Sequence, residues 1–330
     1  MTDKDSFTLS VVVPAYNETA VLPEFHRRLV STLSSLGAEW EIVYVNDGST
    51  DKTWETMIRL EEPRVTAIDL SRNFGKEIAM TAGLDHTCGD AVVVIDADLQ
   101  DPPELIPELI SKWKEGFDVV YARRTTRDGE TVLKKITAKL FYRVIQSVCP
   151  VKIPSDTGDF RLLSRRAVEA LKLLREQHRF MKGLFTWIGY SQVAVSYRRD
   201  PRFAGDTKWN YWRLWNFALE GITSFSIGPL KMATYLGLGV AFGAFLYAAF
   251  VIYKTLVFGE SVKGYPSLMV VVLFLGGVQL ISLGVIGEYL GRMFNETKHR
   301  PLYLINRMLP SSLKSNQGNG ILNGSSQSRN

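Results

Sequence analysis

The chain has 330 residues, a hydrophobic content of 46%, a charged content of 22% and a formal net charge of +5. This length exceeds one typical domain, and the apolar content allows a soluble core together with a membrane segment. The basic residues are dispersed and several flank long apolar runs, which favours a membrane surface over nucleic acid as the partner. Cys88 and Cys149 lack the neighbours that would indicate zinc or redox chemistry. The N-terminus does not resemble a signal peptide, so we expect the soluble part to stay where it is made.

Short β-branched runs alternate with longer segments of helical period from residue 9 to about residue 124. This alternation is typical of βαβ units with a mostly parallel sheet, so we predict a doubly wound α/β domain. Strands are expected at residues 9–13, 41–46, 65–70, 91–95 and 118–122. Helices are expected at residues 21–36, 77–86 and 103–115.

Three of the expected strands end in polar clusters, which read PAYNE at residues 14–18, NDGS at residues 46–49 and DAD at residues 96–98. Ligands of open α/β sheets bind at the carboxyl ends of strands. We therefore expect these clusters to converge on one ligand edge.

The middle of the chain is expected to supply two loops that close over this edge. Residues 130–148 have helical period, and residues 155–161 read as a polar turn ahead of a helix that begins near Arg165. A strand-like segment at residues 192–197 leads to the second loop, residues 200–208. Residues 209–228 are rich in tryptophan and predict an amphipathic helix in the headgroup layer, with a core helix as the alternative.

Two uncharged apolar runs follow, at residues 232–253 and 265–286. Each is long enough to cross the ~30 Å hydrocarbon layer. We predict an antiparallel transmembrane hairpin at residues 229–291, with spans at about 232–258 and 265–287, and a partly disordered cytosolic tail at residues 292–330. Flanking basic residues place both chain ends in the cytosol, although two lysines in the opposite loop weaken this bias: Lys231, Arg292, Lys298 and Arg300, against Lys254 and Lys263.

Asp96, Asp98 and Gln100 are spaced two apart after an apolar strand, so a continued extended backbone would point all three side chains the same way. Oxygen ligands of this kind suit Mg²⁺ or Mn²⁺ and leave coordination positions open for the phosphates of a substrate. The alternative is that the carboxylates are solvated or cap the helix near Pro103. The position at a strand end, next to other polar strand ends, favours the metal.

The motifs VVVPAYNE, VNDGSTD, DADLQDPPE, DTGDFRLLSR and GDTKW, in this order, resemble the family 2 glycosyltransferases of the GT-A (Rossmann-like) fold. With the two-helix hairpin and the closing GEYLGR, the resemblance covers nearly the whole chain. It extends to the polyprenyl-phosphate glycosyltransferases, the group of dolichyl-phosphate mannose synthase and the GtrB-like bactoprenol glucosyl transferases. The resemblance implies a GT-A catalytic domain at residues 1–208.

The resemblance also implies roles for individual residues. Pro14, Tyr16, Glu18 and Asp47 are expected to hold the nucleoside, with Asp47 bonded to the base and Tyr16 packed on it. Lys76 resembles a position in the family's nucleotide loop. Asp98 and Gln100 are expected to bind the metal, with Asp96 at the metal or the ribose. Without the resemblance, these residues would read as a cap and turn after a strand and as a solvated lysine.

The acceptor side is expected to be basic, because the acceptor is itself an anion. Arg123, Arg202 and Lys208 match the basic positions that the family uses for phosphate, although each alone would read as a surface charge. Asp159, and with less support Asp156, matches the acidic residue that faces the acceptor. A phosphate monoester is already mostly ionised at pH 7, so this acid is expected to position rather than to deprotonate.

We therefore expect inverting transfer of a hexose, glucose from UDP-glucose, to undecaprenyl or another polyprenyl phosphate at the cytosolic face of the cell membrane. A GDP-mannose donor stays open. A processive polysaccharide synthase is less favoured because the chain has no Arg-Trp pair and only two spans, and a silent scaffold is less favoured because the acidic residues are intact. Glycines of the two spans permit either homo-oligomers or packing within the hairpin: Gly237, Gly239, Gly243, Gly276 and Gly277.

Overall fold

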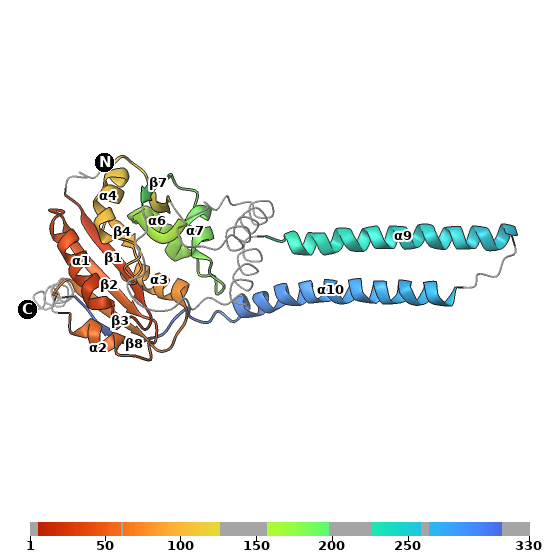
Figure 1. Ribbon diagram of the computed structural model, residues 1–330, viewed down its shortest axis with the longest axis horizontal. Coiled ribbons are helices and arrows are strands. Elements are labelled where there is room, and N and C mark those ends of the chain that lie inside the picture. The colour runs from red at the N-terminus through yellow and green to blue at the C-terminus, as the bar shows by residue number, and fades with distance from the viewer. Residues whose placement is uncertain (1–5, 61, 126–156, 198–225, 259–263, 312–330) are drawn as a thin grey trace, which may run out of the picture. The chain divides into compact units, whose positions relative to one another are not determined.

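The protein is described from a computed structural model, which covers residues 6–60, 62–125, 157–197, 226–258 and 264–311 (Figure 1). The chain divides into two units. The sheet unit holds the described residues up to 197 together with residues 301–311, and the hairpin unit holds residues 226–300.

The sheet unit is built on eight strands in the order β7-β5-β6-β4-β1-β2-β3-β8. The strands β1 (Thr8–Ala15), β2 (Glu39–Asn46), β3 (Val65–Leu70) and β4 (Ala91–Val94) are parallel neighbours, and β5 (Val119–Arg124) is parallel to β7 (Gln192–Tyr197). All five strands expected before residue 124 are confirmed, as is the strand at residues 192–197. Their β-branched runs are buried on both faces, which is what a covered parallel sheet requires.

Residues 157–161 are not the turn that the sequence predicted. They begin β6 (Thr157–Ser164), which is fully buried and pairs antiparallel with both β4 and β5. The polar start of this segment was misleading because Asp159 and Arg161 are buried charges, which are rare inside a strand. The sheet is therefore mixed.

Helices cover both faces of this sheet. One core cluster joins β1 to α1 (Leu22–Ser34), α2 (Thr53–Ile58) and α4 (Ile106–Lys114), which follows the 3-10 turn η1 (Pro103–Leu105). A second cluster packs α3 (Lys76–Asp85) on β2 and β3. The expected helices α1, α3 and α4 are confirmed, as is α6 (Arg165–Leu173), which begins where expected. Neither α2 nor α7 (Met181–Trp187) was predicted.

A glycine lets α3 lie close to the sheet. A Cβ at Gly83 would come within 2.2 Å of Val12 Cγ1 and 3.3 Å of Val45 Cγ2. The first contact is far inside van der Waals distance and the second is tight, so a larger residue would push α3 outward. This packing fixes the first residue of α3, Lys76, near the strand ends.

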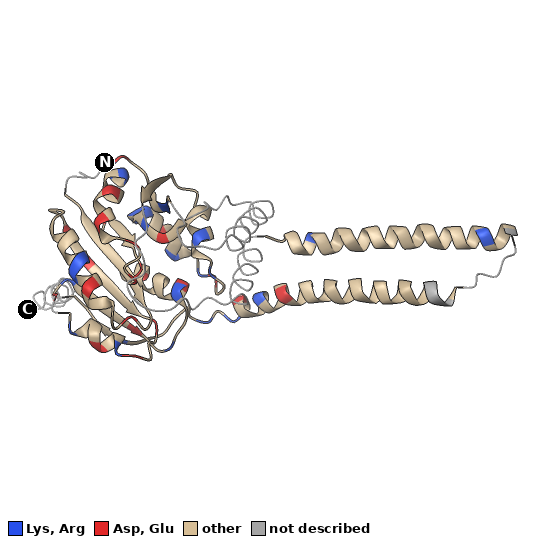
Figure 2. Cartoon of the chain, viewed as in Figure 1, with Lys and Arg blue, Asp and Glu red and all other residues tan. Residues whose placement is uncertain are grey.

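The hairpin unit consists of two long antiparallel helices, α9 (Gly228–Phe258) and α10 (Tyr265–Thr297) (Figure 1). Charged residues are dispersed over the sheet unit but lie only near the ends of these two helices (Figure 2). Their apolar side chains are largely exposed within the unit, and each helix is long and apolar enough to cross a membrane. The expected pair of apolar spans is thus present. A Cβ at any of the five glycines singled out in the sequence would meet nothing within 4 Å, so these glycines do not bring α9 and α10 together.

Both helices are longer than predicted, because α9 begins at Gly228 and α10 continues past its apolar run. α10 extends ten residues beyond residue 287 through a polar end, where Arg292 pairs with Glu288 at 3.0 Å. At about 1.5 Å per residue, a helix of this length is about 50 Å long. It is therefore longer than the ~30 Å hydrocarbon layer of a membrane.

The chain after the hairpin returns to the sheet unit, which the prediction of a tail at residues 292–330 did not include. The strand β8 (Ile305–Leu309) pairs antiparallel with the edge strand β3. All five of its residues are exposed, so it lacks the buried alternation that reveals a strand in a sequence. Residues 312–330, the expected helices at 130–148 and 209–225, and the loop at 200–208 lie outside the described residues.

Candidate active site

The polar strand ends of the sheet unit meet at one edge, as expected. β1, β2 and β4 are parallel neighbours, so their carboxyl ends lie together. β6 runs antiparallel beside β4, with Arg161 opposite Val94, so its first residues lie at the same edge. Continuing this register by two residues places Asp159 opposite Asp96. The unpredicted strand thus brings a second carboxylate to the first DAD residue.

The DAD motif forms a turn directly after β4. Asp96, Asp98 and Gln100 are half-buried, whereas Ala97 and Leu99 between them are buried, which matches the expected alternation. Leu99 has a φ of 58°, a left-handed conformation that costs a leucine about 1 kcal/mol. The turn is closed by Asp98 Oδ1, which accepts a hydrogen bond from Gln100 N at 3.0 Å. The two carboxylates are therefore presented by a fixed, strained turn.

Lys76 joins the two facing carboxylates. Its Nζ donates to Asp96 Oδ2 at 2.6 Å and also to Asp159 Oδ2. Partial burial opposes the charge on the half-exposed Lys76, but Asp159 and Asp96 outweigh it and raise the pKa of the ammonium group. Burial also opposes ionisation of Asp159, yet Lys76 and Lys182 hold the pKa of that carboxyl well below its usual range. At Asp96 burial prevails and raises the pKa. Lys76 and Asp159 thus form a charged pair at neutral pH.

Asp47 holds the loop that leads to Lys76. The Asp47 side chain is buried, and its two oxygens accept hydrogen bonds from Phe74 N at 2.7 Å and Gly75 N at 3.0 Å. Burial raises the pKa of this carboxyl, and the two backbone donors oppose the rise. In this structure Asp47 therefore fixes the residue 73–75 loop. Its expected bond to a base stays a prediction.

The other expected nucleoside residues lie along the turn after β1. Pro14 is buried in β1, opposite Val45 of β2. Tyr16 is 37% exposed. Glu18 N donates to Thr53 Oγ1 at 2.9 Å, and the Glu18 carbonyl accepts from the start of α1. The turn that the sequence allowed is present, but α1 has no side-chain cap, and the nucleoside role of these residues stays a prediction.

The end of β5 supplies one expected basic residue and one that was not expected. Arg123 is exposed at the end of β5. Its neighbour Arg124, which sequence reasoning missed, donates to Tyr197 Oη at 3.4 Å, and Tyr197 Oη donates to the buried carboxylate of Asp101. Only the pairing of β5 with β7 brings these residues together, so sequence spacing carried no signal for them. The other expected residues, Asp156, Arg202 and Lys208, lie outside the described residues.

Two further charged residues near Asp159, Arg161 and Glu77, were not predicted from the sequence. Arg161 is 4% exposed, and its guanidinium lies 3.7 Å from the ring centre of Phe185. Burial lowers the pKa of Arg161 to about 10, so it stays charged at neutral pH. Glu77 accepts a hydrogen bond from Met181 N at 3.1 Å, and burial together with Asp159 raises its pKa to about 7. Arg161 follows Asp159 by two residues, a spacing that indicates one shared face only if the segment is recognised as a strand.

Comparison with known proteins shows the family to which this chain belongs. Residues 10–172 match the family described as Glycosyl transferase family 2, and residues 219–293 match the GtrB C-terminal hairpin. An uncharacterized glycosyltransferase of Synechocystis sp. is 57% identical over 299 residues, which cover 90% of this chain and 94% of the relative. The chain belongs to glycosyltransferase family 2.

Other relatives in family 2 are similar over the same length. A bactoprenol glucosyl transferase of Shigella phage SfV is 51% identical over 90% of this chain and 97% of its own. A prophage bactoprenol glucosyl transferase homolog of Escherichia coli is 50% identical over 91% and 99%. Among solved structures, glucosyl-3-phosphoglycerate synthase from Mycobacterium tuberculosis with Mn²⁺, UDP-glucose and phosphoglyceric acid is 23% identical, with a TM-score of 0.43 over 67% of this chain and 79% of that one.

The oxygen atoms of this family 2 site fit a divalent cation. Asp96 Oδ1 and Asp159 Oδ1 are buried and have no hydrogen-bond partner among the described residues. A buried carboxylate oxygen without a donor costs about 1–3 kcal/mol, which a bound cation would remove. No group of three His, Cys, Asp or Glu side chains in the described part of the chain could hold a metal by itself. The two DAD aspartates and Gln100 would therefore leave coordination positions to a ligand.

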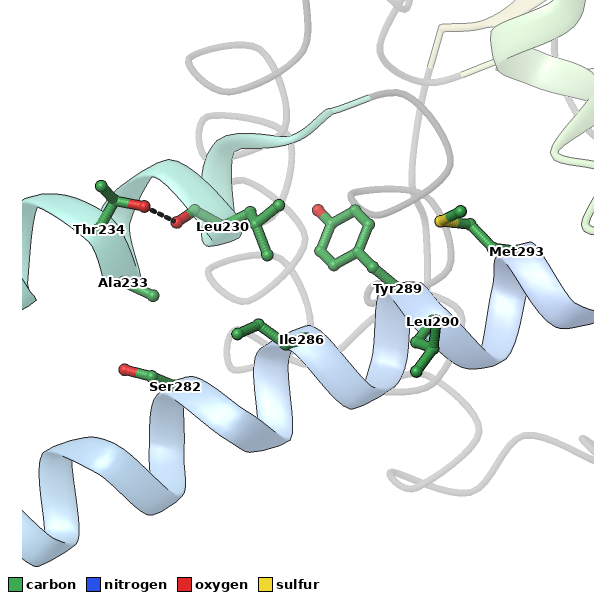
Figure 3. A pocket seen from close by; sticks show the side chains of 8 residues that line it. All are labelled: Leu230, Ala233, Thr234, Ser282, Ile286, Tyr289, Leu290 and Met293. Carbon is green, nitrogen blue, oxygen red and sulfur yellow. Dashed lines mark hydrogen bonds between the residues drawn. The ribbon is translucent and has the colours of Figure 1, made fainter.

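The GtrB hairpin contains an apolar cavity between α9 and α10 (Figure 3). Its volume is about 430 Å³, and side chains that line it include Leu230, Ile286 and Met293. Two of its hydroxyls donate to backbone carbonyls of their own helix: Thr234 to Leu230 at 3.1 Å and Ser282 to Val278 at 2.9 Å. These hydroxyls are already engaged and the rest of the lining is mainly apolar. The cavity therefore suits hydrocarbon rather than a phosphate group.

A glycine next to Asp47 provides a test of whether the residue 73–75 loop contributes to donor binding. A Cβ at Gly48 would lie 2.3 Å from Arg72 C and 2.4 Å from Asn73 N, and its φ is +59°. Gly48→Ala is therefore expected to displace the residue 73–75 loop and to raise the donor KM at least about tenfold, or about 1.4 kcal/mol. Steady-state kinetics measures this.

Gly37→Ala is the matched control. Gly37 has a φ of +65°, but nothing lies within 4 Å of its Cβ position, so the variant carries the backbone strain without the clash. Equal KM values for both variants would show that the close approach of Gly48 is not what holds the loop.

Proposed function

We propose that this chain transfers glucose from UDP-glucose to a polyprenyl phosphate, undecaprenyl phosphate in the first instance, and inverts the anomeric carbon. The observation that carries the proposal is the 51% identity with a bactoprenol glucosyl transferase over 90% of this chain. That relative's name specifies both a glucosyl group and a polyprenol. The match to the GtrB hairpin extends the similarity into the apolar helices, which suit a lipid acceptor.

In the proposed reaction, an oxygen of the lipid phosphate attacks the anomeric carbon, and the bond from that carbon to the nucleoside diphosphate breaks. Such a single displacement turns an α-linked donor into a β-linked product. Asp96, Asp98 and Gln100 would hold Mg²⁺ or Mn²⁺. When bound, this cation would neutralise negative charge on the departing diphosphate. Asp159 is ionised and lies opposite Asp96, so we assign it to orient the acceptor rather than to take a proton.

The remaining residues divide between donor and acceptor. We assign the nucleoside to Pro14, Tyr16, Glu18 and Asp47, and the diphosphate to Lys76. Positive charge suits the phosphate groups, so the acceptor phosphate is assigned to the basic set of Arg123, Arg202, Lys208 and, from the contacts of β5, Arg124. Asp156 is kept as a second acidic residue beside Asp159.

The helices α9 and α10 associate with the membrane, and we propose that they span it with the catalytic domain and both chain ends in the cytosol. Lys231 at the start of α9 and Arg292 near the end of α10 support this orientation, because basic residues favour the cytosolic side. A cytosolic site also has access to nucleotide-sugars. The domain limits proposed are residues 1–208, an interfacial helix at 209–228, the hairpin at 229–291 and the segment 292–330.

Transfer to lipid tests the proposal. The full-length protein in detergent is incubated with undecaprenyl phosphate, Mg²⁺ or Mn²⁺, and labelled UDP-glucose, UDP-galactose or GDP-mannose in separate reactions. Label from UDP-glucose in the lipid extract, lost with EDTA and restored by Mn²⁺, is the expected result. Label from GDP-mannose alone would mean that the donor is GDP-mannose and not UDP-glucose. Label in a polymer would indicate a processive polysaccharide synthase. An α-linked lipid product would exclude single displacement.

A further inference from the structure

One lysine balances a pair of opposed carboxylates at the candidate metal site. Asp96 and Asp159 are both contacted by Lys76 Nζ, so the two carboxylates lie close together, and like charges at close range disfavour each other's ionised form. Within the described residues, Lys76 Nζ is the only hydrogen-bond donor to either carboxylate. The Oδ1 atom of each carboxylate has no partner there. The lysine thus supplies the positive charge at a site whose oxygens suit a divalent cation.

Lys76 can leave this position without disturbing the fold. Its side chain is 42% exposed, whereas the side chains of Asp96 and Asp159 are 22% and 10% exposed. It is the first residue of α3 and follows Gly75, whose φ is 98°. A lysine ammonium group on a flexible four-carbon stem can reorient toward another anion. The two carboxylates, in contrast, are fixed by strand pairing and by the turn after β4.

We propose that Lys76 is the resting counter-cation of the metal site and couples metal binding to donor binding, an inference that rests on the proposed use of a divalent cation with a nucleotide-sugar. While Lys76 bridges the carboxylates, a divalent cation alone has to compete with it. The diphosphate of a donor gives Lys76 a second anionic partner, so donor and cation together displace it from the carboxylates. Such coupling is reciprocal, and the donor is therefore bound more tightly with the cation present.

Lys76→Met tests this coupling in the full-length protein. Methionine keeps an unbranched chain and removes the charge and both hydrogen bonds. Binding of Mn²⁺ alone, without nucleotide or lipid, is measured from the spin-resonance signal of the free ion. The variant is expected to bind Mn²⁺ about tenfold more tightly than the wild type, because the competing charge is gone. In a thermal melt, added Mn²⁺ is expected to raise the midpoint of the variant more than that of the wild type.

Lys182→Met is the matched control. Lys182 contributes positive charge to the surroundings of Asp159 but donates no hydrogen bond to Asp159 or Asp96 within the described residues. Its loss is expected to change Mn²⁺ affinity less than about threefold, since its charge acts from a greater distance. Lys76→Gln, which removes the charge but keeps a donor, replaces Lys76→Met if that variant does not fold.

The inference is overturned if the Lys76 variant binds Mn²⁺ no more tightly than the wild type, or if Lys182→Met tightens binding as much. Neither result depends on the identity of the sugar or the lipid, because the assay contains neither. A different donor in the transfer assay would therefore revise the proposed function and leave the coupling intact. Unchanged Mn²⁺ affinity in Lys76→Met would remove the coupling whatever the rate of transfer, whereas normal transfer in this variant would in addition remove the assignment of the diphosphate to Lys76.

Discussion

Asp98→Asn is expected to lower kcat for transfer by about 10³-fold, or about 4 kcal/mol, while the thermal midpoint changes little. The asparagine Oδ1 can still accept the hydrogen bond from Gln100 N, so the turn after β4 is preserved. The charge is lost, however, and with it the ability to hold a divalent cation tightly. Initial rates with labelled UDP-glucose and undecaprenyl phosphate, together with a melt of each protein, measure both quantities.

Glu115→Gln makes the same chemical change at a surface ion pair, where Glu115 contacts Lys112 and is 48% exposed. Such pairs contribute little, so this variant is expected to keep wild-type rates and stability. A high residual rate in Asp98→Asn with Mn²⁺ present would show that the DAD carboxylate does not carry the metal. A large fall in its melting midpoint would instead mean that the turn had been lost, and the rate would then say nothing about charge.

The parallel part of the fold could be predicted from the sequence because its signal is local. The strand ends that carry Asp47 and Asp96 follow apolar β-branched runs, and parallel pairing brings such ends together without further information. The expected residues on β1, β2 and β4 accordingly meet at one edge. The helices α9 and α10 were equally clear, since a long uncharged run has few alternative structures.

What could not be predicted depends on contacts between distant segments. β6 begins with a polar sequence, and only its burial between β4 and β5 makes it a strand. The bridge by Lys76 between Asp96 and Asp159 and the link from Arg124 to Tyr197 follow from that insertion and from the pairing of β5 with β7. Sequence motifs named several of these residues but gave no sign that one lysine would neutralise two of them.

Asp69→Ala is expected to lower the melting midpoint by roughly 10 °C, because Asp69 anchors β8 to the sheet. Asp69 is 4% exposed, and its carboxylate accepts from Asn46 Nδ2 at 2.7 Å, Asn306 Nδ2 at 2.9 Å and Arg307 Nε at 3.0 Å. Removing it leaves the buried Asn46 amide without this acceptor and releases both β8 side chains. Breaking a buried charged contact of this kind costs about 3 kcal/mol. Scanning fluorimetry of the full-length protein measures the midpoint.

Arg307→Ala removes the ion pair with Asp69 but keeps the buried Asp69 carboxylate as the acceptor for Asn46. The Arg307 side chain is 58% exposed, so its loss is expected to cost only about 1 kcal/mol and a correspondingly smaller fall in the midpoint. Because Asn46 precedes Asp47, which fixes the residue 73–75 loop, Asp69→Ala is also expected to raise the donor KM more than Arg307→Ala does. Equal midpoints for the two variants would mean that β8 is held by its backbone pairing with β3, and that the segment after the hairpin does not reach the nucleotide loop through Asp69.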